Sequence, residues 1–325
     1  TRLGVERLEV HAVPFEGEQA VANNTRPVRV AVDDRRLKLL YLDGSSSWDF
    51  RFLNRALQRD PGVEVQTRSA WPLRAAGVLP ADLADRMGVP DSADGFAAYD
   101  AVLLGDVSAP VLPEARQRAL LRAVRELGVG LILHCGPTGM PADFVASPLA
   151  RAFPTRLISA SRQPVEPDGA WALSLGVTAA GAAHPAFRLS GDAARTRAAW
   201  RQMPGFYWAA RLGEPRPGAQ TLAHAVDPRG RETPLIVTHT LERGRVVAVG
   251  TDATYRWRHN RGNTIFYRFW GQLLRTTARD SDPTDKTWLR ARPLVADVGE
   301  PVTVELFSRP AVSQPRRSAT VWVRG

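Results

Sequence analysis

One stretch of the sequence, residues 99–141, limits the possible folds more than any other. It contains two short apolar runs, AVLLGD and GLILHC, on either side of a segment whose apolar residues recur with helical spacing, LPEARQRALLRAVRELG. A buried strand, a helix and a second buried strand in this order form a βαβ unit. The stretch therefore predicts an α/β domain with a mostly parallel central sheet.

Other segments extend this sheet. Residues 37–43 (LKLLYLD) are too uniformly apolar for a half-exposed strand and fit a central strand of a parallel sheet. Short turns separate three later strands, 221–227, 234–241 and 245–252, and predict antiparallel neighbours.

Two helices should cover the sheet. The first follows residue 47 and is expected to place Trp48, Phe52, Leu53 and Leu57 on its inward face. The second, residues 262–275, should place Ile265, Phe269, Leu273 and Leu274 inward.

Polar residues follow the predicted central strands at the point where each strand ends. In parallel sheets the functional groups lie at this carboxyl edge. We expect a ligand or partner to bind there, on a surface that combines carboxylates, an arginine and tryptophans: Asp43, Trp48, Asp106, Asp252, Trp257 and Arg258. Three carboxylates could bind a hard cation, but strand-end aspartates are more often turn residues. We therefore expect no metal and no cofactor.

The net charge of +10 raises the question of nucleic-acid binding. Of 43 basic residues only Lys38 and Lys286 are lysine, and the arginines are spread along the chain. A phosphate-binding face requires basic residues that cluster, so we expect no nucleic-acid partner. No apolar run approaches the roughly 20 residues that span a bilayer.

The two ends of the chain differ from its middle. Residues 1–35 and 281–325 alternate apolar and polar positions, which predicts β-sandwich segments on either side of an α/β domain at 36–280. The chain begins with Thr1, inside the first of these segments. We expect it to be a piece of a longer protein.

Four sequence blocks resemble a known family: LKLLYLDGSSSWDFRFLNRALQRDPGVEV, YDAVLLGDV, ELGVGLILHCGP and RGRVVAVGTDATYRWRHNRGNTIFYRFWGQLLR. They are similar to the glutamine-amidotransferase-like domain of bacterial membrane-anchored proteins that often also carry a von Willebrand factor A domain. The resemblance covers residues 37–279. It implies a class I glutamine-amidotransferase-like fold, which is a flavodoxin-like three-layer sandwich, with immunoglobulin-like flanks. It also implies protein partners in a membrane-associated assembly.

The catalytic motifs of true class I amidotransferases are incomplete here. Cys135, the one cysteine, matches the nucleophile of their G-x-C-x-G turn, but neither glycine is present and Pro137 lacks an N–H that an oxyanion hole needs. Thr251, Asp252 and Ala253 replace their His-Pro-Glu. A thiol needs a nearby imidazole or positive field to ionise at neutral pH. His134 should point away from Cys135 on a strand, so His259, in the loop after the last strand, is the candidate base.

Two functions follow from these residues. The first, which the missing His-Pro-Glu favours, is a non-catalytic binding or scaffolding module. The alternative is a cysteine-dependent amidase or glutamine hydrolase that uses Cys135 with His259 as a non-standard base. If Cys135 is not a nucleophile, it should be a small buried apolar residue at a strand end.

Overall fold

A computed structural model describes residues 4–11, 25–32, 35–165, 173–259, 262–279, 287–292 and 303–308. The chain divides into two compact units, Arg36–Arg279 on the one hand and Thr1–Arg35 with Asp280–Gly325 on the other. In the second unit β1 (Gly4–His11) pairs antiparallel with β2 (Thr25–Val32), and β13 (Thr287–Arg292) pairs antiparallel with β14 (Thr303–Ser308). The immunoglobulin-like character of these ends stays a prediction, because much of each end lies outside the described residues.

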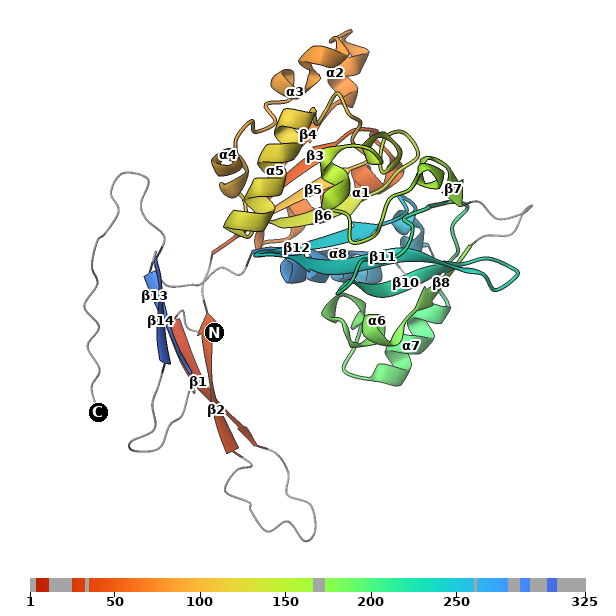
Figure 1. Cartoon of the computed structure of the whole chain (residues 1–325). Helices are drawn as coiled ribbons and strands as arrows, with labels where there is room; N and C mark the ends of the chain where they lie inside the picture. Colours follow the sequence, from red (N-terminus) through yellow and green to blue (C-terminus); the bar gives the residue numbers. More distant parts are fainter. Residues whose placement is uncertain are drawn as a thin grey trace. The chain divides into compact units, whose positions relative to one another are not determined.

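An eight-stranded sheet forms the centre of the larger unit (Figure 1). In spatial order its strands are β4 (Val63–Ser69), β3 (Leu37–Asp43), β5 (Ala101–Gly105), β6 (Gly130–His134), β12 (Gly244–Val249), β11 (Glu232–Leu241), β10 (Gln220–Val226) and β8 (Ser174–Val177). The pairs from β4 to β12 are parallel, and those from β12 to β8 are antiparallel. The predicted α/β fold with a mostly parallel sheet is confirmed, as are the antiparallel strands β10, β11 and β12. A further short pair joins β7 (Pro164–Val165) to β9 (Ala209–Ala210).

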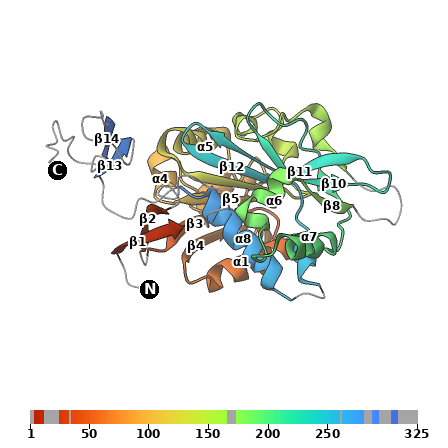
Figure 2. The same ribbon diagram turned by 90° about the horizontal axis from the view of Figure 1, so that it is seen from below.

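Helices cover both faces of this sheet. The helices are α1 (Trp48–Arg59), α2 (Trp71–Ala75), α3 (Leu83–Arg86), α4 (Ala93–Ala97), α5 (Glu114–Leu127), α6 (Ala179–Ala183), α7 (Ala193–Arg201) and α8 (Thr264–Thr277). Figures 1 and 2 show α5 on one side of the sheet and α1 with α8 on the other. Among the described residues, no helix is both long and apolar enough to cross a lipid bilayer.

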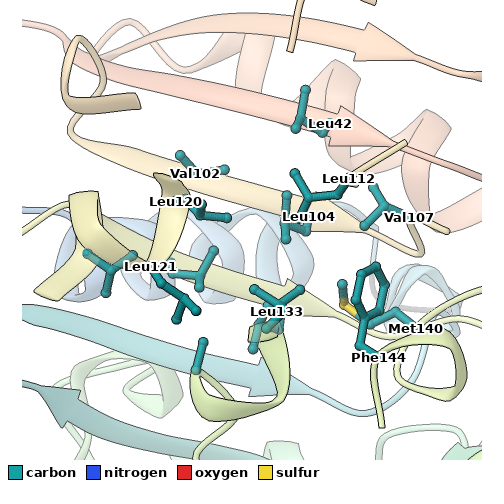
Figure 3. Close-up of a cluster of buried hydrophobic side chains, with 14 of the residues drawn as sticks. Leu42, Val102, Leu104, Val107, Leu112, Leu120, Leu121, Leu133, Met140 and Phe144 are labelled. Carbon is teal, nitrogen blue, oxygen red and sulfur yellow. The ribbon is translucent and has the colours of Figure 1, made fainter. Parts of the chain in front are cut away.

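Side chains alternate along the strands between two apolar cores. Leu40 and Leu42 of β3 face the α5 core, whereas Leu39 and Tyr41 face the core under α1 and α8. Figure 3 shows part of the α5 core, where Leu104 and Leu133 lie beside Val107, Met140 and Phe144 beyond the strand ends. This alternation decides on which side each residue after a strand end lies.

Helix α1 has a different inward face from the one expected. Ser47 caps the helix, its Oγ accepting a hydrogen bond from the Phe50 N–H at 3.1 Å. The buried positions are Asp49, Leu53, Ala56 and Leu57, which follow the i, i+4, i+7, i+8 spacing of one helical stripe. Trp48 lies one position, about 100°, away from this stripe, and 59% of its side chain is exposed. The prediction that Trp48 points inward is wrong. Asp49 occupies the inward position in this turn of the helix.

One other local prediction needs correction. In α8 Phe266 and Trp270 are buried beside Phe269, Leu273 and Leu274, while the expected Ile265 is only half-buried. The segment after Pro141 forms two short 3₁₀ turns, η3 (Ala142–Phe144) and η4 (Pro148–Arg151). Pro148 at the start of the second turn has no N–H to continue an α-helix.

Candidate functional site

The ends of β3, β5, β6 and β12 lie side by side at the carboxyl edge of the sheet. Asp43 ends β3, and Asp106 and Cys135 directly follow β5 and β6. Asp252 follows β12 after a short turn. Because these strands are neighbours in the sheet, Asp43, Asp106 and Asp252 lie at the same edge.

Asp106 anchors the loop that follows Cys135. Its carboxylate accepts hydrogen bonds from the Thr138 N–H (3.0 Å) and hydroxyl (2.6 Å), and from the N–H groups of Gly139 (2.8 Å) and Met140 (2.9 Å). The side chain is 3% exposed, and the backbone has a left-handed φ of 45°. The anion-binding N–H groups of this loop are thus already used by an internal carboxylate. Asp106, expected to bind a ligand, is a structural residue.

Asp43 is also buried, with 1% exposed, and accepts hydrogen bonds from the Ser46 N–H (2.8 Å) and the Ser69 hydroxyl (3.2 Å). Burial raises its pKa to about 6, although these two hydrogen bonds oppose the shift. Its side chain does not face solvent, so we interpret it as part of the edge and not as a ligand-binding group.

Asp252 is half-buried and accepts a hydrogen bond from the Trp208 Nε1–H at 2.9 Å. Burial raises its pKa to about 6 as well, the charge of His134 opposing the shift and that of Asp49 adding to it. Among the residues that the structure describes, no three His, Cys, Asp or Glu side chains are arranged to hold a metal ion.

Cys135 lies in the α5 core and has no exposed surface. Its N–H donates to the Val249 carbonyl at 2.8 Å, so the residue still continues the sheet. Burial raises the pKa of the thiol well above its ordinary value, and the charge of Asp106 adds to the shift. A thiol in such surroundings stays protonated at neutral pH and is a poor nucleophile.

His134, the residue before Cys135, faces the opposite side of the sheet. Its Nε2 lies 3.2 Å from Oδ2 of Asp49 and 3.0 Å from the Thr251 carbonyl. Burial alone would lower the pKa of His134, but the hydrogen bond and charge of Asp49, with the charge of Asp252 and the Thr251 carbonyl, together raise it. The expectation that His134 points away from Cys135 agrees with this geometry.

Asp49 is the residue of this edge that the sequence did not single out. Besides His134, it accepts hydrogen bonds from the Thr254 N–H (3.0 Å) and hydroxyl (2.7 and 2.8 Å). The Trp270 Nε1–H donates to the same hydroxyl at 3.0 Å. Asp49 thereby joins α1 to η7 (Thr254–Arg258), α8 and β6 through a buried polar network. The available signal was its helical spacing with Leu53 and Leu57.

His259 does not pair with Cys135. It is exposed and lines a pocket with Phe52 and Tyr255, which pack against the core under α1 and α8. Cys135 lies in the other core, across the sheet. The predicted Cys135–His259 pair is therefore wrong, because the two side chains lie on opposite faces.

Trp257 is fully buried. Its ring makes T-shaped contacts with Trp200 (5.3 Å between centroids) and Phe269 (5.0 Å). The prediction that Trp257 offers a stacking face to a ligand is wrong, because η7 turns this side chain inward against α8.

The exposed part of the edge consists of stacked aromatic rings and arginines. The Phe52 ring stacks on Trp48 (6.0 Å, 20°) and on Tyr255 (6.2 Å, 27°). The guanidinium of Arg258 lies 3.6 Å from the Phe52 ring centroid, and that of Arg51 lies 5.1 Å from Trp48. We call these five residues the arginine–aromatic patch. It contains the predicted Trp48 and Arg258 and adds three residues that the sequence reasoning did not select as ligands.

A pocket of about 480 Å³ lies next to this patch. Its lining residues are Phe52, Pro204, Tyr255, Arg256, Arg258 and His259. It combines ring surface with guanidinium donors, and such a mixture suits a ligand that is both apolar and anionic.

The comparisons with known proteins bear on the fold alone. No family model and no curated protein matches the chain. The Cytoplasmic Protein STM1381 from Salmonella typhimurium LT2 is similar in structure, with 17% identity, a TM-score of 0.51, and coverage of 75% of this chain and 100% of that chain. The Cytoplasmic Protein STM3548 from Salmonella typhimurium has 14% identity and a TM-score of 0.50, covering 85% of this chain and 97% of that chain. At these identities the likeness shows a shared α/β fold.

Proposed function

We propose that the α/β unit is a non-catalytic binding module built on a class I glutamine-amidotransferase-like, flavodoxin-like fold. One observation carries this proposal: the Cys135 side chain is fully buried in the α5 core, and the neighbouring His134 faces the other side of the sheet. A cysteine nucleophile needs access to its substrate and a base or positive field close to its sulfur. Cys135 lacks this access, and no base lies beside its sulfur among the described residues that surround it.

The loop after Cys135 supports the same proposal. A cysteine hydrolase stabilises the oxyanion of its tetrahedral intermediates with free N–H donors near the sulfur. The N–H groups of Thr138, Gly139 and Met140 instead donate to the Asp106 carboxylate. A strained backbone marks a nucleophile turn. Here the left-handed φ occurs at Asp106, after β5, and Cys135 does not have a positive φ.

The binding surface in this proposal is the arginine–aromatic patch with its adjoining pocket. Exposed tryptophan and arginine side chains are the types that most often dominate protein interfaces. The family resemblance of residues 37–279 supports protein partners in a membrane-associated assembly, with the β-rich ends as immunoglobulin-like modules.

Release of ammonia from glutamine by the full chain tests this proposal. We expect no release above the background of the Cys135→Ala variant, because that variant removes a buried thiol that takes no part in chemistry. Ammonia release that disappears in Cys135→Ala would contradict the proposal and support the cysteine-dependent amidase instead.

A further inference from the structure

The pocket beside the arginine–aromatic patch carries positive charge without internal neutralisation. Arg256 and Arg258 extend from η7, and His259 follows them. Among the described residues that line the pocket, none is an aspartate or glutamate. No ion pair joins Arg256 or Arg258 to a carboxylate within the part of the chain that the structure describes.

Each of the two guanidinium groups is held in place through its own Nε. Nε of Arg256 donates to the Gly205 carbonyl at 2.7 Å, and its guanidinium lies 4.7 Å from the Tyr207 ring centroid. Nε of Arg258 donates to Oδ1 of Asn263 at 2.6 Å, with the guanidinium over Phe52. The terminal Nη groups of both arginines have no hydrogen-bond partner among the described residues. A fork fixed in this way loses little conformational entropy when it binds an anion.

Another arginine-lined groove in the described part of the chain differs in this respect. It follows α5, has a volume of about 820 Å³ and contains Arg118, Arg122 and Arg125. Arg118 pairs with Glu114 (2.9 Å), and Arg125 hydrogen-bonds to Glu242 through Nε (2.8 Å). Acidic neighbours largely satisfy these arginines, so the groove is a weaker anion site than the pocket at η7.

From this geometry we infer that the pocket binds carboxylates of an acidic peptide segment in a protein partner, through Arg256 and Arg258. The inference rests on the proposed function and names the chemistry of the partner. A planar guanidinium can donate two parallel hydrogen bonds to one carboxylate. Two such forks in one pocket favour a segment with several Asp or Glu residues, and the rings of Phe52 and Tyr255 provide apolar contact beside them.

The same surface is poorly suited to single-stranded nucleic acid. Such binding uses aromatic faces that are free to stack on bases. Here guanidinium groups already lie over the rings of Phe52, Trp48 and Tyr207, so the surface presents hydrogen-bond donors in place of open faces. A nucleic-acid groove also needs a row of cations that follows successive phosphates, whereas these arginines form one local group.

Fluorescence anisotropy with labelled octaglutamate tests the inference on the full chain, at about 0.15 M salt where distant charges are screened. We expect octaglutamate to bind and octaglutamine not to bind. Arg256→Gln/Arg258→Gln should weaken octaglutamate binding roughly tenfold or more, because each lost charge-assisted hydrogen bond is worth that much. Arg256→Lys/Arg258→Lys keeps the charge but removes the forks, so we expect an intermediate loss. The lysine variant also provides a second test of the inference if the glutamine variant does not fold.

A matched control removes the same charge elsewhere. Arg118 and Arg122 are exposed on α5, on the side of the sheet opposite to α1 and α8 (Figures 1 and 2). Arg118→Gln/Arg122→Gln should leave octaglutamate affinity within about twofold of the parent, since screening confines the effect of distant charges. An equal loss in this control would show a diffuse charge effect and overturn the inference.

Two other results also overturn it. One is no binding of octaglutamate by the folded parent chain. The other is tighter, Arg256- and Arg258-dependent binding of an eight-residue thymidine oligonucleotide, which would assign the pocket to nucleic acid. Glutamine hydrolysis is measured on the same samples. Hydrolysis contradicts the proposed function whatever the peptide does, whereas absent peptide binding without hydrolysis overturns the acidic-ligand inference alone.

Discussion

Nε2 of His134 lies 3.2 Å from Oδ2 of Asp49, on the side of the sheet opposite to Cys135. A histidine and a cysteine that are adjacent in sequence are thus separated by the strand itself, because successive side chains point to opposite faces. The imidazole is committed to a buried network with Asp49 and Thr254. The imidazole next to Cys135 in sequence therefore does not face its thiol.

The first prediction concerns that network. Asp49→Ala leaves the Thr254 N–H and hydroxyl, and His134, without their buried acceptor. We expect the free energy of unfolding to fall by about 3–5 kcal/mol, because each buried group left without its hydrogen-bond partner costs about 1–3 kcal/mol. Urea denaturation measures it. Glu126→Ala breaks only an exposed ion pair with Arg122 on α5 and should change stability little. A similar small effect at Asp49 would show that the network does not stabilise the fold.

The second prediction concerns pH. Burial raises the pKa of Asp43 from 3.8 to about 6, so the native state binds more protons than the unfolded state between these values. For such a group, stability falls as pH rises through the window. Asp43→Asn removes the titration but keeps a side-chain oxygen for Ser46 and Ser69. We expect its stability, relative to the parent, to rise by roughly 2–3 kcal/mol from about pH 4 to about pH 7. A difference that stays constant across this range would contradict the raised pKa.

The third prediction concerns the contact between Gly136 and Asp106. A Cβ at Gly136 would lie 2.4 Å from the Asp106 carboxyl group, which four hydrogen bonds hold in place. We expect Gly136→Ala to lower the free energy of unfolding by about 2–4 kcal/mol, because this carboxylate cannot move without losing its donors. A Cβ at Gly191 meets no atom within 4 Å, so Gly191→Ala is the control. Equal melting temperatures for the two variants would disprove the anchoring role of Asp106.

The sequence was sufficient to predict the architecture and the place of the polar edge. Uniformly apolar runs identified the parallel strands β3, β5 and β6, and strand ends identified Asp43, Asp106 and Asp252 as residues of one edge. Strand ends of a parallel sheet meet at one edge whatever the details of packing. For this reason the sequence alone predicts that the three aspartates lie at the same edge.

The orientation of side chains around that edge was harder to predict. Apolar residues alone define the predicted inward stripe of α1, so this prediction omits Asp49 although its spacing with Leu53 and Leu57 fits the stripe. Trp257 lies in a 3₁₀ turn, where a shift of one residue decides between core and solvent. Burial of a carboxylate depends on partners that are distant in sequence, here Thr254 and His134. Periodicity carries no information about such partners.

The central claim, that Cys135 is a buried structural residue, is tested most directly by a glutamine-analogue electrophile such as 6-diazo-5-oxonorleucine. The folded full chain is incubated with the reagent, and intact mass spectrometry measures the covalent adduct. We expect no adduct on the folded protein, because the thiol is fully buried and its pKa is raised. A general thiol reagent should modify Cys135 only after unfolding in urea. Stoichiometric modification of Cys135 by the glutamine analogue in the folded protein would contradict this account.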